Sequence, residues 1–98
     1  PPDYRPEAHG LGPEALPLFS ALSTLFDPLR ISPTPGEFER LLADLLQRVF
    51  GLDALRQALF GHIEGLERER LHAEAVLPAL QAVLDALDAW RGVDHIEL

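Results

Sequence analysis

The chain contains no cysteine, lysine, asparagine or methionine among its 98 residues. Without cysteine it can form neither disulfide bonds nor a thiolate site. No apolar run approaches the ~18 residues that a membrane-spanning helix needs, and no secretory signal is visible. We therefore expect a cytoplasmic protein with no membrane partner. The start at Pro1 rather than methionine leaves open that the chain is a piece of a longer protein.

The charge of the chain is strongly unbalanced. Its formal net charge is −8, and every basic side chain other than histidine is arginine, a bias that indicates a GC-rich bacterial genome. Surplus negative charge opposes binding to nucleic acid and to anionic membranes, so this domain alone is expected to bind neither. A hydrophobic fraction of 47% and a charged fraction of 24% predict one folded domain rather than disorder.

Prolines organise the first third of the chain. Residues 1–13 are rich in proline and glycine and predict an extended leader, which Tyr4 and Leu11 would pin to the body. Leucine and phenylalanine at helical spacing predict a helix over 14–27, and Pro28 is expected to end it at about Asp27.

The next helix has a strong start signal. Thr34 suits the N-cap, Pro35 the first helical position, and Glu37 completes a Thr-x-x-Glu capping box. The apolar spacing that follows predicts a helix over 35–50, which Gly51 would stop.

From Leu52 onward, apolar side chains recur every seven residues. The register passes through Pro78 without a change of phase, which favours one long helix kinked at Pro78 over two helices at 53–76 and 78–91. The domain would then cover 14–92 and end in a short acidic tail, 93–98. The register positions are Leu52, Leu59, Leu66, Ala73, Leu80 and Leu87.

The expected fold class is all-α, a small bundle of about three to four helices. The apolar stripe of the last segment is longer than the earlier helices can cover, so a homodimer is expected to bury the surplus. The alternative is a turn at Pro78 that closes the stripes within a monomer. The expected interface consists of Leu59, Leu66, Ala73, Val76, Leu80, Val83, Leu87 and Trp90.

Two short motifs in this segment have competing interpretations. Gly61 and Gly65 either permit a close helix crossing or mark a helix end at Gly65. Glu69-x-x-His72 has the spacing of metal-binding bundle helices, with His62 one heptad before Glu69. A solvated charged face explains the same residues more simply, and we expect no cofactor.

No catalytic set is apparent, so a non-enzymatic function is expected. The first hypothesis is an acidic protein-interaction or dimerisation module that binds itself or another protein. The second is a dimerisation or ligand-sensing domain of a transcriptional regulator, and the third a ferritin-like metal-binding protein. The regulator hypothesis requires an apolar cavity, which would be lined by Phe19, Phe26, Phe38, Phe50 and Phe60.

Overall fold

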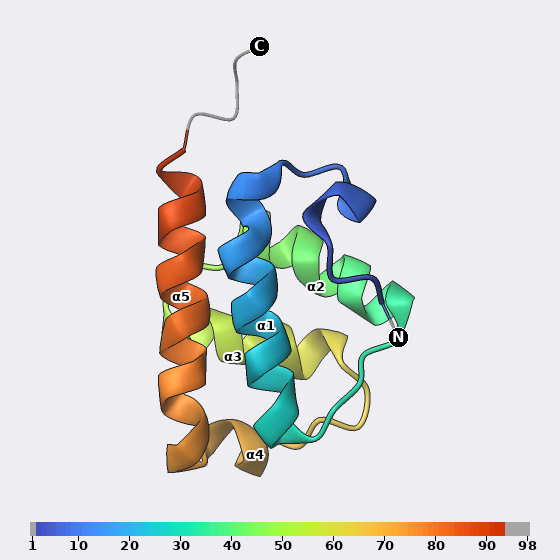
Figure 1. Cartoon of the computed structure of the whole chain (residues 1–98). Coiled ribbons are helices and arrows are strands. Elements are labelled where there is room, and N and C mark those ends of the chain that lie inside the picture. The colour runs from blue at the N-terminus through green and yellow to red at the C-terminus, as the bar shows by residue number, and fades with distance from the viewer. Residues whose placement is uncertain (1, 94–98) are drawn as a thin grey trace.

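The computed structural model describes residues 2–93, and within this range the chain is helical without strands (Figure 1). This confirms the all-α fold class. None of the helices in the described range is both long and apolar enough to cross a lipid bilayer. The α-helices are α1 (Leu16–Leu29), α2 (Pro35–Gln47), α3 (Leu52–His62), α4 (Arg68–His72) and α5 (Leu77–Arg91). The 3-10 helices are η1 (Pro6–His9), η2 (Pro13–Ala15) and η3 (Glu74–Val76).

The helices form two layers. Helices α1 and α5 lie side by side and antiparallel, while α2 and α3 pass behind them at a steep angle (Figure 1). Most leucine and phenylalanine side chains of these helices point inward, so one apolar core lies between the layers, while Leu16 and Phe60 are exposed. Helix α4 closes the end of the bundle where α1 finishes and α5 begins.

Helix α1 begins and ends two residues later than its leucine spacing predicted. The first turn after Pro13 is the 3-10 helix η2, and the α-helix starts at Leu16. The α-helix runs through Pro28 to Leu29, whose side chain is buried. The chain then closes in a Schellman motif, in which Arg30 adopts a left-handed conformation and Ile31 N–H donates to the Phe26 carbonyl.

The capping box at the start of α2 is confirmed. Glu37 N–H donates to Thr34 Oγ1 at 3.1 Å, and Thr34 N–H donates to Glu37 Oε1 at 2.7 Å. Pro35 occupies the first helical position, where its missing N–H costs nothing. Local sequence alone therefore determines this helix end.

The other end of α2 comes three residues before the predicted boundary. The helix stops at Gln47, and Val49 turns back into the core. Arg91, in the last turn of α5, donates from Nη2 to the carbonyls of Leu45 and Val49 at 2.7 and 2.6 Å. Arg91 thus satisfies, from another helix, one carbonyl in the last turn of α2 and one in the segment that follows, which supports the early end of α2.

The expected long helix is not present, so the prediction of continuity from residue 53 to Pro78 is wrong. Helix α3 ends at His62, Ile63 is extended, and Gly65 has a φ of +79°. The backbone N–H of Glu64 donates to Glu37 Oε2 at 2.6 Å, which ties this turn to the start of α2. The helix-end interpretation of Gly65 is therefore correct. A Cβ at Gly61 would meet no atom within 4 Å, so Gly61 does not permit a close crossing.

The chain reaches α5 through two short elements, α4 and η3. Pro78 lies in the first turn of α5, a position that accepts proline without a kink. The leucines of α5 pack mainly against α1 and α3. The chain thus folds back on itself before Pro78 and covers its own apolar stripe.

Candidate functional site

The expected dimer interface is largely internal. Six of its side chains are buried by the chain's own helices, while Ala73 is exposed and Trp90 half-buried. An interface built from this set would have to open the core. The surplus apolar stripe that led to the dimer hypothesis is therefore absent from the folded chain. The six buried residues are Leu59, Leu66, Val76, Leu80, Val83 and Leu87.

The three candidate metal ligands do not lie together in one site. Glu69 and His72 are both exposed on α4. His62 lies at the end of α3 and contacts Asp44 on α2, with His62 Nε2 and Asp44 Oδ2 3.2 Å apart. Within residues 2–93, no group of three or more histidine, aspartate or glutamate side chains is arranged to hold a metal ion.

The five phenylalanines do not surround one cavity. Phe19, Phe26 and Phe38 fill the core, and the ring centroid of Phe38 lies 5.7 Å from that of Phe19 and 6.5 Å from that of Phe26. Phe50 and Phe60 are exposed, the first after α2 and the second on α3. The cavity expected for a ligand-sensing domain is therefore occupied by the rings that were expected to line it.

Asp44 links α2 to α3 through its contact with His62, and it also contacts Arg48. Arg48, the residue that follows α2, donates from Nε to Asp44 Oδ1 at 2.8 Å. Partial burial alone would raise the pKa of Asp44, but the hydrogen bonds and charges of His62 and Arg48 outweigh it and lower the pKa. The arrangement holds a carboxylate between the His62 ring and the Arg48 guanidinium group and accounts for His62 as a structural residue.

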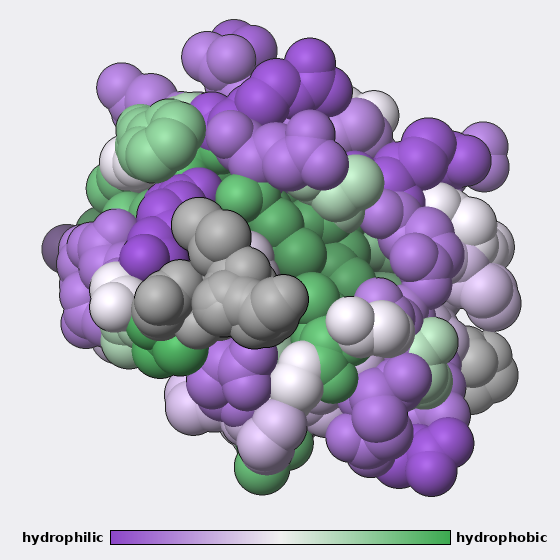
Figure 2. Space-filling view, turned by 90° about the horizontal axis from the view of Figure 1, so that it is seen from above, coloured by the Kyte–Doolittle hydropathy of each residue, from purple (hydrophilic) through white to green (hydrophobic). Residues whose placement is uncertain are grey.

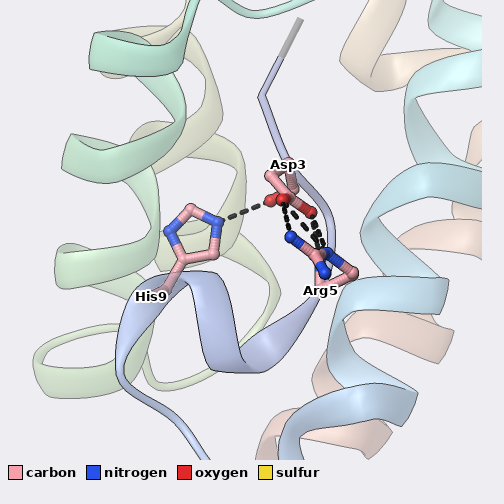
Figure 3. Close-up of polar contacts among 3 residues, drawn as sticks. All are labelled: Asp3, Arg5 and His9. Atoms are coloured by element: carbon pink, nitrogen blue, oxygen red, sulfur yellow. Dashed lines mark hydrogen bonds and ion pairs between the residues drawn. The ribbon is translucent and has the colours of Figure 1, made fainter.

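His9 belongs to the leader that was expected to be extended, but its side chain is only 6% exposed. The ring packs against Phe19 and Phe38, with one nitrogen on Glu39 of α2 and Nε2 2.5 Å from the Asp3 carbonyl oxygen (Figure 3). The leader is thus docked on the body and forms η1 instead of remaining extended. Tyr4, whose ring also packs on Phe38, and the partly buried Leu11 pin the leader to the body as the sequence predicted, whereas the docking of His9 was not predicted.

The neighbouring Asp3 and Arg5 form an exposed pair in the same leader (Figure 3). Arg5 Nη2 donates to Asp3 Oδ2 at 2.6 Å, and its Nε and backbone N–H donate to the same carboxylate. These hydrogen bonds lower the pKa of Asp3 to about 2. The pair is exposed to water and shapes the leader rather than a reactive site.

A small pocket lies between α3 and α4. Its volume is about 230 Å³, and it exists because the turn at Gly65 brings one face of each helix together. The α3 face contributes residues spaced three or four apart, and so does α4. The lining residues are Asp53, Arg56, Gln57, Phe60, Arg68, Leu71 and His72. We call this site the α3–α4 pocket.

Two arginines, Arg56 and Arg68, line the α3–α4 pocket and contribute positive charge to it. The Nε atom of Arg56 is buried and has no hydrogen-bond partner. The Arg68 guanidinium carbon lies 5.7 Å from the centroid of the Phe60 ring. The sequence did not predict that Arg56 and Arg68 line one pocket. They come together only through the turn after His62, where the apolar register favoured a continuous helix.

A second surface feature lies at the opposite end of the bundle. Phe50 is 70% exposed there, and the Arg91 guanidinium carbon lies 4.4 Å from its ring centroid. Leu16 at the start of α1 and Val93 after α5 are also exposed, and α1 starts at the end where α5 finishes. Figure 2 shows hydrophobic surface in the middle of this face, between hydrophilic side chains. We call Leu16, Phe50 and Val93 the end surface.

Comparisons with known protein families, with curated proteins and with solved structures find no match to this chain.

Proposed function

We propose that this chain is a non-enzymatic helical module that binds another protein through the end surface. The observation that carries the proposal is the exposure of the large apolar side chains Leu16, Phe50 and Val93. Leu16 and Val93 lie at the end where α1 begins and α5 finishes, and Phe50 packs on Arg91 in the last turn of α5. Apolar residues gathered on a surface mark protein interaction sites more often than single scattered ones do. Aromatic residues such as Phe50 are enriched in the central part of such interfaces.

The rigidity of the end surface supports the same function. Arg91 is fixed by two hydrogen bonds to backbone carbonyls, and its guanidinium group packs on the Phe50 ring. A side chain that is already held in place loses less conformational entropy on binding than a mobile one. Arg91 and Phe50 are therefore expected to lose little conformational entropy when a partner binds.

Charge indicates the kind of partner. The whole chain carries a formal net charge of −8, so a neutral or basic protein would approach it without long-range repulsion. In this proposal the partner binds the exposed end surface instead of the expected dimer interface. The six buried leucine and valine residues of that expected interface belong to the core.

Site-specific photo-crosslinking tests the proposal. The photoreactive residue p-benzoylphenylalanine replaces Phe50 in one variant and Phe60 in a matched control, because both are exposed phenylalanines on different surfaces. In cells of the organism that makes this protein, we expect a discrete adduct with another protein from position 50 only. Leu16→Glu in the same chain should abolish that adduct.

Two results would contradict the proposal. Equal adducts from positions 50 and 60 would show that exposure alone determines the reaction. Adducts of twice the chain mass alone would identify a second copy of this chain, rather than another protein, as the occupant.

A further inference from the structure

The docked leader, residues 2–11, covers an aromatic part of the core beside α1 and α2 (Figure 1). Its two rings, Tyr4 and His9, pack on phenylalanines of both helices. The Phe38 ring lies against both of them, with centroid distances of 5.2 Å to Tyr4 and 5.3 Å to His9. Opening of the leader would therefore expose apolar rings that the docked form buries.

Both ring nitrogens of His9 face oxygen atoms that can only accept hydrogen bonds. Nδ1 contacts Glu39 Oε2 of α2, and Nε2 lies 2.5 Å from the Asp3 carbonyl oxygen (Figure 3). An ionised carboxylate and a backbone carbonyl have no proton to donate. A neutral imidazole has one N–H group, so it satisfies one of these oxygens and turns a nitrogen lone pair toward the other. Only the imidazolium form donates to both.

The charges around His9 favour the same form. Helix α2 presents the Glu39 carboxylate to the ring, and the leader presents Asp3, which is paired with Arg5. Helix α1 contributes a phenylalanine ring, and its one ionisable residue, Asp27, lies roughly 12 Å farther along the helix. Burial against aromatic rings opposes a charge, but two charge-assisted hydrogen bonds and a nearby carboxylate offset that cost.

We propose that the leader is a pH-sensitive strap, which docks on α1 and α2 while His9 carries a proton on each ring nitrogen. Loss of one of these protons removes a hydrogen bond and places a lone pair against an acceptor, so the docked leader loosens as the pH rises. Histidine is the side chain whose ordinary titration falls between pH 5 and 8, which places the change in the physiological range. The strap is separate from the end surface and does not depend on the proposed partner.

Hydrogen exchange of the leader amides in the full chain tests this inference. Leu11 N–H donates to the Pro6 carbonyl at 3.0 Å, so its protection reports whether the leader is folded. Protection is taken relative to the free peptide at the same pH, which removes the chemical pH dependence of exchange. We expect it to fall about tenfold from pH 5.5 to pH 7.5, in line with the loss of one charged hydrogen bond. The Leu84 amide in the middle of α5 should keep its protection.

Substitutions assign the pH dependence to His9. His9→Gln offers a neutral amide in place of the ring and should make the protection of Leu11 nearly independent of pH. His72→Gln removes an exposed histidine from α4, outside the leader, and should leave the wild-type pH dependence unchanged. Glu39→Gln keeps His9 and its packing but removes the carboxylate charge, and should reduce the change.

The nitrogen shifts of the His9 ring give a direct readout. At pH 6, with the leader docked, both ring nitrogens should have the shifts of protonated nitrogen. A bare ring nitrogen in the docked leader would overturn the proposal, and so would protection of Leu11 that is equal at pH 5.5 and 7.5. If His9→Gln fails to dock at any pH, an unchanged pH dependence in Glu39→Gln would overturn it as well.

Discussion

Residues 52–76 and residues 77–91 share one seven-residue spacing of apolar side chains, yet they fold differently. The second stretch is a single helix, α5, whereas the first is divided into α3, α4 and η3. The difference arises at the turn after His62, where Gly65 has a positive φ. Apolar spacing thus shows which side of a segment faces the core, but helix interruption depends on separate local signals and tertiary contacts.

The two stretches should respond differently to the loss of a leucine at the same register position. Leu80 is fully buried in α5, so Leu80→Ala should lower the free energy of unfolding by about 2–5 kcal/mol through lost burial and a cavity. Leu52 is half-buried at the start of α3, and Leu52→Ala should cost on the order of 1 kcal/mol. Urea unfolding of both variants measures the difference. Equal losses of unfolding free energy would indicate that Leu52 and Leu80 are buried to the same extent, as expected for one continuous apolar stripe.

The carboxylate that ties the turn to α2 should have the next largest effect. Glu37 is buried and accepts backbone N–H groups from Thr34 and Glu64. Glu37→Gln removes these charge-assisted hydrogen bonds and should lower the free energy of unfolding by about 1.5–3 kcal/mol at pH 7. Chemical denaturation of wild type and variant at one pH gives the value directly. A loss below a few tenths of a kcal/mol would show that the tether contributes little.

The same carboxylate predicts a pH dependence. The N–H groups of Thr34 and then Glu64 lower the pKa of Glu37 from its usual value of 4.5. A lowered pKa in the folded state means that the stabilisation is present above about pH 4.5 and is lost as the pH falls toward the folded pKa. The stability difference between wild type and Glu37→Gln should therefore shrink between pH 5 and the acid limit of folding. A constant difference across that range would contradict this assignment.

The two glycines of the interrupted stretch should give the smallest effects, and of opposite sign. Gly65→Ala places a side chain at a φ of +79° and should cost about 1–2 kcal/mol. Gly61→Ala lies inside α3 in open space and should stabilise by about 0.5–1 kcal/mol. Thermal melting of the two variants makes the comparison. Destabilisation by Gly61→Ala would restore the close helix crossing that the structure does not show.

Local signals made part of the fold predictable. The capping box of Thr34 and Glu37 involves residues a few positions apart, so the sequence contains all of the information needed for this helix start. The start of α5 near Pro78 agrees only with the two-helix alternative, which the sequence favoured less than a continuous helix. The early end of α2 could not be predicted from local sequence, because it depends on Arg91, which is 42 residues after Val49 in the chain. The docked His9 is unpredictable for the same reason, since its partner Glu39 is 30 residues away.

The candidate sites were harder to predict than the fold. The expected interface residues were identified correctly as apolar contacts, but their partners are other helices of the same chain. The α3–α4 pocket required the turn at Gly65, for which the sequence supported two interpretations equally. Exposed Phe50 could not be recognised, because a helix through residue 50 would have counted it among the core positions.

The distance between residues 53 and 81 tests the fold-back of residues 52–91 most directly. Both side chains are exposed and the chain has no native cysteine, so Asp53→Cys and Gln81→Cys can carry spin labels for double electron–electron resonance. Leu52 and Gln81 border the same surface hollow, so we expect a short distance. A continuous helix would separate the two sites by roughly 42 Å at 1.5 Å per residue. A distribution centred near that value would contradict the fold and the pocket that depends on it, whereas a peak well below it would support both.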